Sequence, residues 1–327
     1  MATIRPRDLL PDELLADLGR PGALARDIAR LADAGYLNVA LPPEFGGGLG
    51  CTLRQAACGQ RRLTRHAPDT ALAVSAHLYW TGAAADACRA GDESMRWILA
   101  EAGRGALFAG GHAEAGGDLR FADPRSRCEP SGEGGYRFRD AGVLSSMTPA
   151  WDRIAVHAVH AVGQAGRPQS VIAFAGRGNR CTPGFRVARV SAAGTPGDVF
   201  TTSALTWGHS ILASVQYSDA RRAFNDAITA CAAAVTPAAF ADPKASGRPT
   251  RRWPVAEAGL LLDELKAKIA EITHPWQLVQ APTPDLGGQH LISLHALRHE
   301  VAEGSATVHA LVSQLTGPAA PARPLSL

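Results

Sequence analysis

The chain has 327 residues, of which 46% are hydrophobic and 19% are charged, and its formal net charge is +3. This length favours two or three packed domains with an apolar core. The small net charge argues against a nucleic-acid-binding surface. The longest apolar stretches are interrupted by charged residues or glycine, and none reaches the roughly 18 residues that a membrane span requires.

The N-terminal residues and the cysteines indicate an intracellular protein. The first eight residues contain no apolar segment of the kind found in a secretion signal. The six cysteines form no Cys-x-x-Cys pair, and their wide spacing argues against both a zinc site and a disulfide framework. We therefore expect a cytoplasmic protein with reduced thiols and no metal site.

The first third of the chain has the periodicity of helices. Apolar residues recur at helical spacing within residues 8–35, 52–66, 69–90 and 92–102, and Pro21-Gly22 interrupts the first of these stretches. Asp69 and Asp92 precede helical stretches and suit the N-cap position, where a side chain accepts a hydrogen bond from a free backbone N–H. The Pro- and Gly-rich residues 42–50 are expected to form a loop.

The middle of the chain alternates apolar and polar residues, as half-buried strands do. This alternation predicts strands at 136–139, 153–159, 171–174, 184–190 and 211–217, and residues 132–135 suit a hairpin turn. Several short strands at this spacing are typical of a small barrel or sandwich.

Helical periodicity returns in the last third, at 219–235, 255–272 and 291–315, and a loop is expected at 236–250. Residues 317–327 contain three prolines and are expected to form a disordered tail. The order of helices, strands and helices predicts an α+β fold. It divides the chain into an N-terminal helical domain at 1–103, a β-barrel domain at 104–218 and a C-terminal helical domain at 219–316.

Six segments, in the same order, resemble the acyl-CoA dehydrogenase family. Residues 35–47 (GYLNVALPPEFGG) resemble an early family segment that ends in Pro-Glu-Glu-Tyr-Gly-Gly. Residues 111–118 (GHAEAGGD) resemble the Thr-Glu-Pro-x-Ala-Gly-Ser-Asp loop, and are closer to its His-Ala-Glu-Ala-Gly variant in actinobacterial members. Residues 135–142 and 145–152 resemble the strand before the flavin-contacting segment and that segment itself. Residues 207–210 resemble a run near the end of the barrel, and 219–224 suit the helix that follows.

The resemblance, which extends over about residues 25 to 315, implies an acyl-CoA dehydrogenase-like fold. It also implies that the protein binds FAD and acts on an acyl thioester of CoA or of a carrier protein. By resemblance, the flavin contacts would be made by Gly111, His112, Ala113, Ser145, Ser146 and Thr148, and the substrate contacts by Glu114 and Gly117. Family members associate, so the resemblance further implies a homo-oligomer, or a hetero-oligomer with a full-length relative.

The sequence also departs from the family. The C-terminal helical domain is expected to be shortened, because the family continues past the helix at 291–315 with a Gly-Gly loop and a further helix pair. No residue matches the catalytic glutamate, so the catalytic residue is unknown, and Leu144-Ser145-Ser146-Met147 replaces the usual Trp-Ile-Thr.

Three functions stay open. The protein is a FAD-dependent oxidoreductase, a non-catalytic or flavin-free member (a partner subunit or a redox-neutral enzyme), or a related flavin monooxygenase.

Two other patterns have both a functional and a structural interpretation. His295 and His299 have the spacing of metal ligands on a helix, but no third ligand accompanies them, so we expect an ordinary helix surface. Arg61-Arg62 and Arg251-Arg252 could bind a phosphate or could be solvated surface. The sequence contains neither the Gly-x-Ser-x-Gly of a hydrolase nor the glycine pattern of a Rossmann site.

Overall fold

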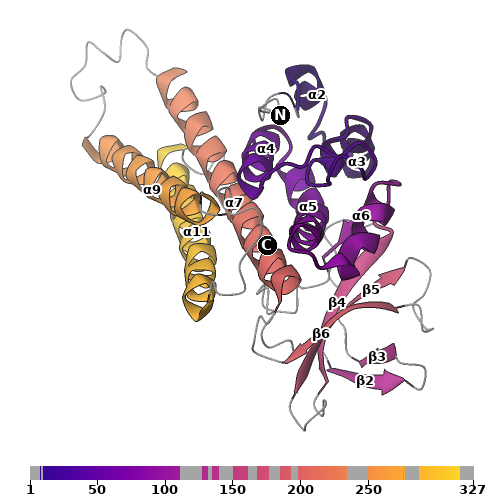
Figure 1. Ribbon diagram of the computed structural model, residues 1–327. Helices are drawn as coiled ribbons and strands as arrows, with labels where there is room; N and C mark the ends of the chain where they lie inside the picture. The colour runs from indigo at the N-terminus through magenta and orange to yellow at the C-terminus, as the bar shows by residue number, and fades with distance from the viewer. Residues whose placement is uncertain are drawn as a thin grey trace.

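The computed structural model describes residues 8, 10–110, 127–131, 135–139, 150–160, 168–176, 185–192, 198–233, 249–274, 276 and 287–316. Helices occupy both ends of this sequence and a sheet occupies the middle, so the predicted order of elements is confirmed (Figure 1). In Figure 1 the N-terminal helices lie on one side of the long helix α7 (Val199–Ala233), and two C-terminal helices lie on its other side.

The N-terminal part agrees with the predicted helices. It contains α2 (Asp12–Ala16), α3 (Leu24–Asp33), η1 (Tyr36–Asn38), α4 (Leu53–His66), α5 (Pro68–Arg89), η2 (Glu93–Met95) and α6 (Arg96–Ala102). Thr52 and Gln55 begin α4 with a capping box, and Asp92 caps η2 as predicted. Asp69 does not cap α5, because Pro68 occupies the first helical position, where its missing N–H costs nothing, and Asp69 falls in the first turn.

The sheet contains four of the five predicted strands. Its members are β1 (Phe108–Ala109), β2 (Arg127–Ser131), β3 (Gly135–Arg139), β4 (Arg153–His160), β5 (Gln169–Gly176) and β6 (Phe185–Ala192). The strand order is β3-β2-β4-β5-β6, and β1 pairs with β4 in parallel. Among the described strands the sheet is open, with β3 and β6 at its edges, so these strands do not form the closed barrel that the sequence predicts.

The largest difference from the predicted elements is α7, a continuous helix of 35 residues. The predicted strand at 211–217 is wrong, because these residues lie in the middle of α7, and the helix begins at Val199 rather than at Asp219. Residues 207–210, which resemble a run near the end of a barrel, lie in the same helix. Most side chains from 200 to 220 are buried. A helix that is buried on nearly all sides has no polar face, so its sequence lacks the helical alternation of apolar and polar residues. Periodicity alone cannot distinguish a short apolar run within such a helix from a strand.

Aromatic side chains join the sheet to the helices. Trp80 of α5 meets Phe174 of β5 edge to face with ring centroids 5.0 Å apart, and Phe108 of β1 meets Phe174 in the same way at 5.5 Å. All three rings are fully buried. Edge-to-face pairs contribute about 0.5–1.5 kcal/mol beyond the burial of their area, so this cluster ties the sheet firmly to α5.

The C-terminal helices are α9 (Pro249–Thr273) and α11 (Gly287–Thr316), which confirms the helices predicted at 255–272 and 291–315. They pack against α7 and form a second apolar core with it. Leu262 and Ile269 of α9, Val301 and Val308 of α11 and Ala220 of α7 are fully buried in this core. The helix α7 therefore contributes to both cores, since Phe200 and Trp207 near its start belong to the larger one.

Candidate functional site

The eight residues for which the sequence predicts flavin or substrate contacts lie outside the described residues. They are Gly111, His112, Ala113, Glu114, Gly117, Ser145, Ser146 and Thr148. Their roles stay predictions, but the structure places the points where both segments attach. The first follows Gly110, just after β1, and the second precedes Ala150, just before β4. Because β1 and β4 pair in parallel, the first segment leaves at the end of β1 and the second enters before the start of β4, so both join the same strand pair but at its opposite ends.

Gly110 lies directly against Tyr79 of α5. A Cβ atom at Gly110 would stand 2.5 Å from the Tyr79 hydroxyl oxygen, so only glycine allows this approach. The ring of Tyr79 also lies beside Gly208 of α7, where a Cβ atom would stand 3.8 Å from ring carbons. Tyr79 therefore lies between Gly110 and α7.

Asp152 and Arg153 fix the second attachment point. The backbone N–H of Leu107 donates to the Asp152 carboxylate at 2.9 Å, and the N–H of Asp152 donates to the Leu107 carbonyl, also at 2.9 Å. Arg153 forms a bidentate ion pair with Glu101 of α6 at 2.8 and 3.0 Å. Bidentate guanidinium–carboxylate pairs have a defined geometry, so they hold the start of β4 against α6.

The helices α7 and α11 meet along a row of polar pairs, which we call the α7–α11 seam. Its pairs are Thr206–His290, His209–His295, Gln216–Arg298 and Asp219–His309. The paired atoms are 2.9 Å apart in the first pair, 2.6 Å in the third and 3.2 Å in the fourth, and the imidazole centroids of the second are 5.2 Å apart. The residue numbers rise together, so the two helices run in the same direction.

The last seam pair holds an ionised carboxylate in a buried position. Burial by itself would raise the pKa of Asp219, but hydrogen bonds from His309 and Arg222 outweigh it and lower that pKa. Both Asp219 and His309 are almost fully buried. Asp219 is therefore a structural acid that is already paired.

His209 is a seam residue with both ring nitrogens lacking a hydrogen-bond partner among the described residues. Its side chain is 2% exposed. Burial lowers the pKa of His209 to about 3, and the neighbouring His295 and Arg298 act in the same direction. The ring is therefore neutral near pH 7 and offers one donor and one acceptor. Buried polar groups are nearly always hydrogen-bonded, so His209 has hydrogen-bonding capacity that the described residues leave unused.

A second buried histidine, His77 of α5, holds the start of β1. Its Nε2 atom lies 3.0 Å from the Leu37 carbonyl oxygen, and its Nδ1 atom accepts a hydrogen bond from the Phe108 N–H at 3.2 Å. Burial lowers the pKa of His77 to about 4, against smaller opposing effects of the Leu37 carbonyl and of Asp152. The neutral ring thus bridges η1 and β1.

These two histidines should make the folded state sensitive to mild acid. An unfolded histidine binds its proton near pH 6.5, whereas His77 does so near pH 4 and His209 near pH 3. Between these values the unfolded chain binds more protons, so the free energy of unfolding falls as the pH falls. Between pH 7 and pH 5 we expect a loss of about 2 kcal/mol for each histidine. Urea denaturation across this range measures it.

A His77→Gln variant should show a shallower pH dependence, because one of the two titrating groups is gone. The exposed His299 provides the matched control, and His299→Gln should leave the slope unchanged. A free energy of unfolding that is constant between pH 7 and pH 5 would contradict the assignment of both rings as buried and neutral.

Asp86 of α5 joins three segments of the chain. Its carboxylate accepts hydrogen bonds from the indole N–H of Trp207 at 2.8 Å and from that of Trp276 at 3.1 Å, and it pairs with Arg89. The side chain is 2% exposed. Burial raises the pKa of Asp86 against the opposing effects of Arg89 and the two indoles. The Trp276 ring in turn stacks on the seam residue His290 at 5.3 Å, so this network links α5, α7 and the seam.

No sequence motif marks Asp86 or His209 as a site residue. For Asp86 a signal was available in the sequence. It is the one acid in the apolar run Ala83-Ala84-Ala85-Asp86-Ala87, and a charged side chain on an apolar helix needs partners.

The structure does not bring His295 and His299 into a three-ligand cluster, and no such cluster occurs among the described residues. The side chains of Arg251 and Arg252 lie outside the description. Within the described part of the chain, no helix combines the length and apolarity of a membrane span.

No protein-family model and no curated protein matches the chain. Among solved structures, butyryl-CoA dehydrogenase from Megasphaera elsdenii is 15% identical, with a TM-score of 0.69 over 99% of this chain and 91% of that chain. KijD3 in complex with FMN and a dTDP-linked amino-keto sugar is 18% identical, with a TM-score of 0.70 over 98% and 85%. A nitrososynthase from Micromonospora carbonacea var. africana is 19% identical, with a TM-score of 0.66 over 90% and 79%. The predicted resemblance is thus confirmed for the fold, and the chain is folded like the acyl-CoA dehydrogenases.

Proposed function

We propose that the protein is a flavin-dependent oxidoreductase. The observation that carries the proposal is the match of nearly the whole chain both to butyryl-CoA dehydrogenase and to KijD3 with bound FMN. The two segments with predicted flavin contacts, 111–117 and 145–148, join the β1–β4 strand pair of this fold, the first after β1 and the second before β4. Fold alone does not define a function, so the described residues must also suit a flavin.

Two features of the described residues suit such a group. Gly110 allows the backbone an approach to Tyr79 that a side chain would prevent, and His209 of the α7–α11 seam has an unused donor and an unused acceptor in a buried position. A bound flavin would supply hydride acceptance, which the side chains of the protein cannot provide. We assign to Ser146 or Thr148 a hydrogen bond to the ring, and to the backbone N–H groups of 111–113 the stabilisation of negative charge on it.

Within this proposal, FAD is the cofactor and an acyl thioester of CoA or of a carrier protein is the substrate. An assembly, either of identical chains or with a full-length relative, belongs to the same proposal. A second candidate is an oxygen-dependent flavin monooxygenase. The similarity to a nitrososynthase favours it, because the formation of a nitroso group adds oxygen to nitrogen. This second reaction needs no carboxylate to remove an α-proton, and the sequence provides no match for one.

The visible absorption spectrum of the purified protein tests the flavin. After incubation with FAD or FMN and desalting, we expect a retained flavin band, stronger with FAD. Thr148→Val should weaken retention about tenfold, since one hydrogen bond to a charged or polarised ring is worth about 1.4 kcal/mol. Thr229→Val, on an exposed part of α7, is the matched control and should retain flavin like the unchanged protein. No retained flavin of either kind would overturn the proposal and favour the flavin-free alternative.

Two further experiments distinguish the dehydrogenase reaction from the monooxygenase reaction. Bleaching of the bound flavin by an acyl-CoA or acyl-carrier thioester without oxygen would support the dehydrogenase. A product that requires both reduced flavin and oxygen would support the monooxygenase and contradict the thioester assignment.

A further inference from the structure

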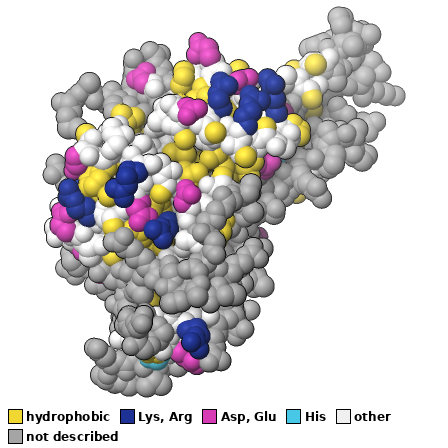
Figure 2. Space-filling view, turned by 90° about the vertical axis from the view of Figure 1, so that its right-hand side faces the viewer, with side chains coloured by type: hydrophobic (Ala, Val, Ile, Leu, Met, Phe, Trp, Pro, Cys, Tyr) yellow, Lys and Arg dark blue, Asp and Glu magenta, His cyan; other side chains and the backbone are white. Residues whose placement is uncertain are grey.

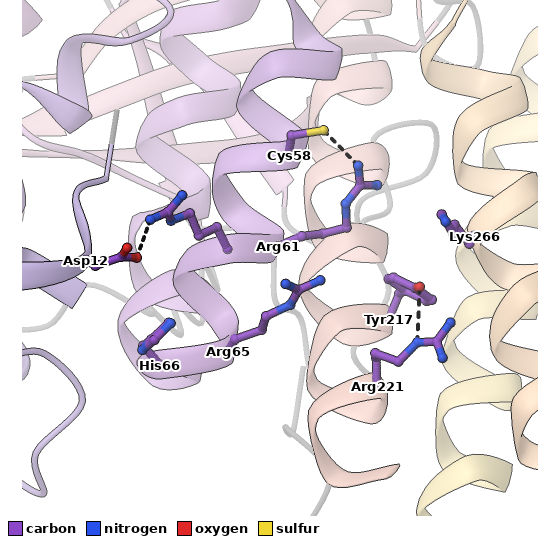
Figure 3. A pocket seen from close by; sticks show the side chains of 9 residues that line it. Asp12, Cys58, Arg61, Arg65, His66, Tyr217, Arg221 and Lys266 are labelled. Atoms are coloured by element: carbon purple, nitrogen blue, oxygen red, sulfur yellow. Dashed lines mark hydrogen bonds and ion pairs between the residues drawn. The ribbon is translucent and has the colours of Figure 1, made fainter. Parts of the chain in front are cut away.

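A basic pocket lies where α4, α7 and α9 meet. It has a volume of about 660 Å³, and Arg61, Arg62 and Arg65 of α4, Tyr217 and Arg221 of α7 and Lys266 of α9 contribute to its lining. Figure 3 shows Arg61 and Arg65 on one side of a common space, and Tyr217, Arg221 and Lys266 on the other. We call this space the α4–α7 pocket.

The α4–α7 pocket concentrates positive charge. Five cationic side chains line it, whereas Asp12 is its one carboxylate. The entire chain carries a formal net charge of +3. The face shown in Figure 2 differs, because Lys and Arg side chains stand there in small groups near Asp and Glu side chains. Like charges that converge on a concave surface repel one another unless an anion compensates them.

The protein compensates these cations only in part. Arg62 pairs with Asp12 at 2.5 Å, and Arg221 pairs with Asp263 at 2.9 Å. Among the described residues, the Arg61 guanidinium has one partner, the Cys58 thiol at 2.9 Å, and a thiol is a weak acceptor. Arg65 and Lys266 have no hydrogen-bond or ion-pair partner in the part of the chain that the structure describes. Most of the guanidinium and ammonium donors are therefore available to a ligand.

The frame of the pocket is fixed before a ligand arrives. The Ser218 hydroxyl of α7 donates to the Arg61 carbonyl at 2.7 Å, which ties the two helices together at the level of the arginines. Tyr217 is 5% exposed, and its hydroxyl oxygen accepts a hydrogen bond from the Arg221 Nε–H at 3.4 Å. The cationic groups thus project from rigid helices, which lowers the entropic cost of binding.

We propose that the α4–α7 pocket binds the diphosphate group of a phosphorylated small molecule. Guanidinium groups match phosphate oxygens in charge and bidentate geometry, and small-molecule sites have volumes of roughly 300–1,000 Å³. The low net charge of the chain argues against a nucleic acid, and a concave site suits a small ligand better than a protein surface. The diphosphate belongs either to a dinucleotide cofactor or to a separate phosphorylated metabolite. The inference does not depend on the flavin proposal.

Isothermal titration with inorganic pyrophosphate, at low and at physiological salt, tests this site on the full chain. We expect saturable binding that weakens as salt rises. Arg65→Gln and Lys266→Gln, both at exposed positions, should each weaken it about tenfold, the effect of losing one charge-assisted hydrogen bond. Asp12→Asn should strengthen binding, because it removes the competing carboxylate and frees Arg62. Arg96→Gln on α6, which does not line the pocket, is the matched control and should change nothing.

Absence of saturable pyrophosphate binding would overturn the proposal, as would equal weakening by Arg96→Gln and Arg65→Gln. Binding of an acidic peptide by a protein that ignores pyrophosphate would also overturn it. FAD retention in Arg65→Gln distinguishes the two sources of the diphosphate. Loss of FAD together with pyrophosphate binding identifies the cofactor, whereas unchanged FAD retention identifies a separate metabolite. A protein that binds pyrophosphate but no flavin would contradict the proposed oxidoreductase and leave the pocket assignment supported.

Discussion

Replacing Asp86 with alanine should lower the free energy of unfolding by about 3–5 kcal/mol, the range for removing one partner of a buried ion pair. The substitution leaves the indole N–H groups of Trp207 and Trp276 without their acceptor and Arg89 without its carboxylate. An unsatisfied buried donor costs about 1–3 kcal/mol, so the two indoles account for much of the loss. Urea denaturation followed by tryptophan fluorescence measures the effect.

Two further variants test whether the loss arises from these hydrogen bonds. Asp86→Asn keeps one oxygen acceptor but loses the charge, so its stability should lie between those of the alanine variant and the unchanged protein. Asp33→Ala, at an exposed position in the last turn of α3, should change the free energy of unfolding by less than about 0.5 kcal/mol. If Asp86→Ala were no more destabilising than Asp33→Ala, Asp86 could not be the acceptor that joins the three segments.

Replacing Gly82 with alanine should destabilise the protein by about 3 kcal/mol, at the upper end for an overpacked core. A Cβ atom at Gly82 would stand 2.4 to 2.5 Å from three ring atoms of Trp207. Carbon atoms pack at about 3.5–4.0 Å, so the indole would have to move. It cannot move freely, because its N–H is bound to Asp86 one turn further along α5. The gain of about 1 kcal/mol in helix propensity offsets only part of this cost.

Gly259 in α9 provides the matched control. A Cβ atom there would meet only Phe224, at 4.0 Å, so Gly259→Ala should raise the stability by up to about 1 kcal/mol. Combining Gly82→Ala with Trp207→Phe should cost less than the sum of the two single changes, because the smaller ring relieves the overlap. If the losses of stability in Gly82→Ala and Trp207→Phe simply added in the double variant, the overlap between the Gly82 Cβ position and the Trp207 ring could not be the cause of the destabilisation.

The sequence predicts the elements whose surroundings are simple. The helix α4 and the strand β4 show clear patterns, and their bounds agree with the prediction to within one residue. The strand β5 and the helix α11 were also predicted, but β5 extends two residues further at each end and α11 begins four residues earlier. The first half of α7 was not recognised because it contacts helices on several sides, which removes the apolar stripe that a pattern requires. The open sheet could not be foreseen either, because strand order depends on contacts between distant residues.

The candidate site was predicted only as far as its segments resemble a family. Ser146 and Thr148 lie in a segment that resembles a family motif, although the structure does not describe them. Asp86 carries no motif, since its partners Trp207 and Trp276 lie 121 and 190 residues away along the chain. In the sequence, Arg61-Arg62 is consistent both with a phosphate site and with a solvated surface. The fold favours a phosphate site, because it brings Arg65, Arg221 and Lys266 into the same pocket.

The α7–α11 seam has a consequence for how the two helices are aligned. Pairs such as Gln216–Arg298 contribute little net stability, because their desolvation offsets most of the attraction. Their geometry, however, admits one alignment. A slip of α11 by one turn, about 5.4 Å, would separate all four pairs at once and leave the buried Asp219 carboxylate without His309. The seam therefore helps to set the alignment of α11 along α7, in addition to the apolar contacts of the second core.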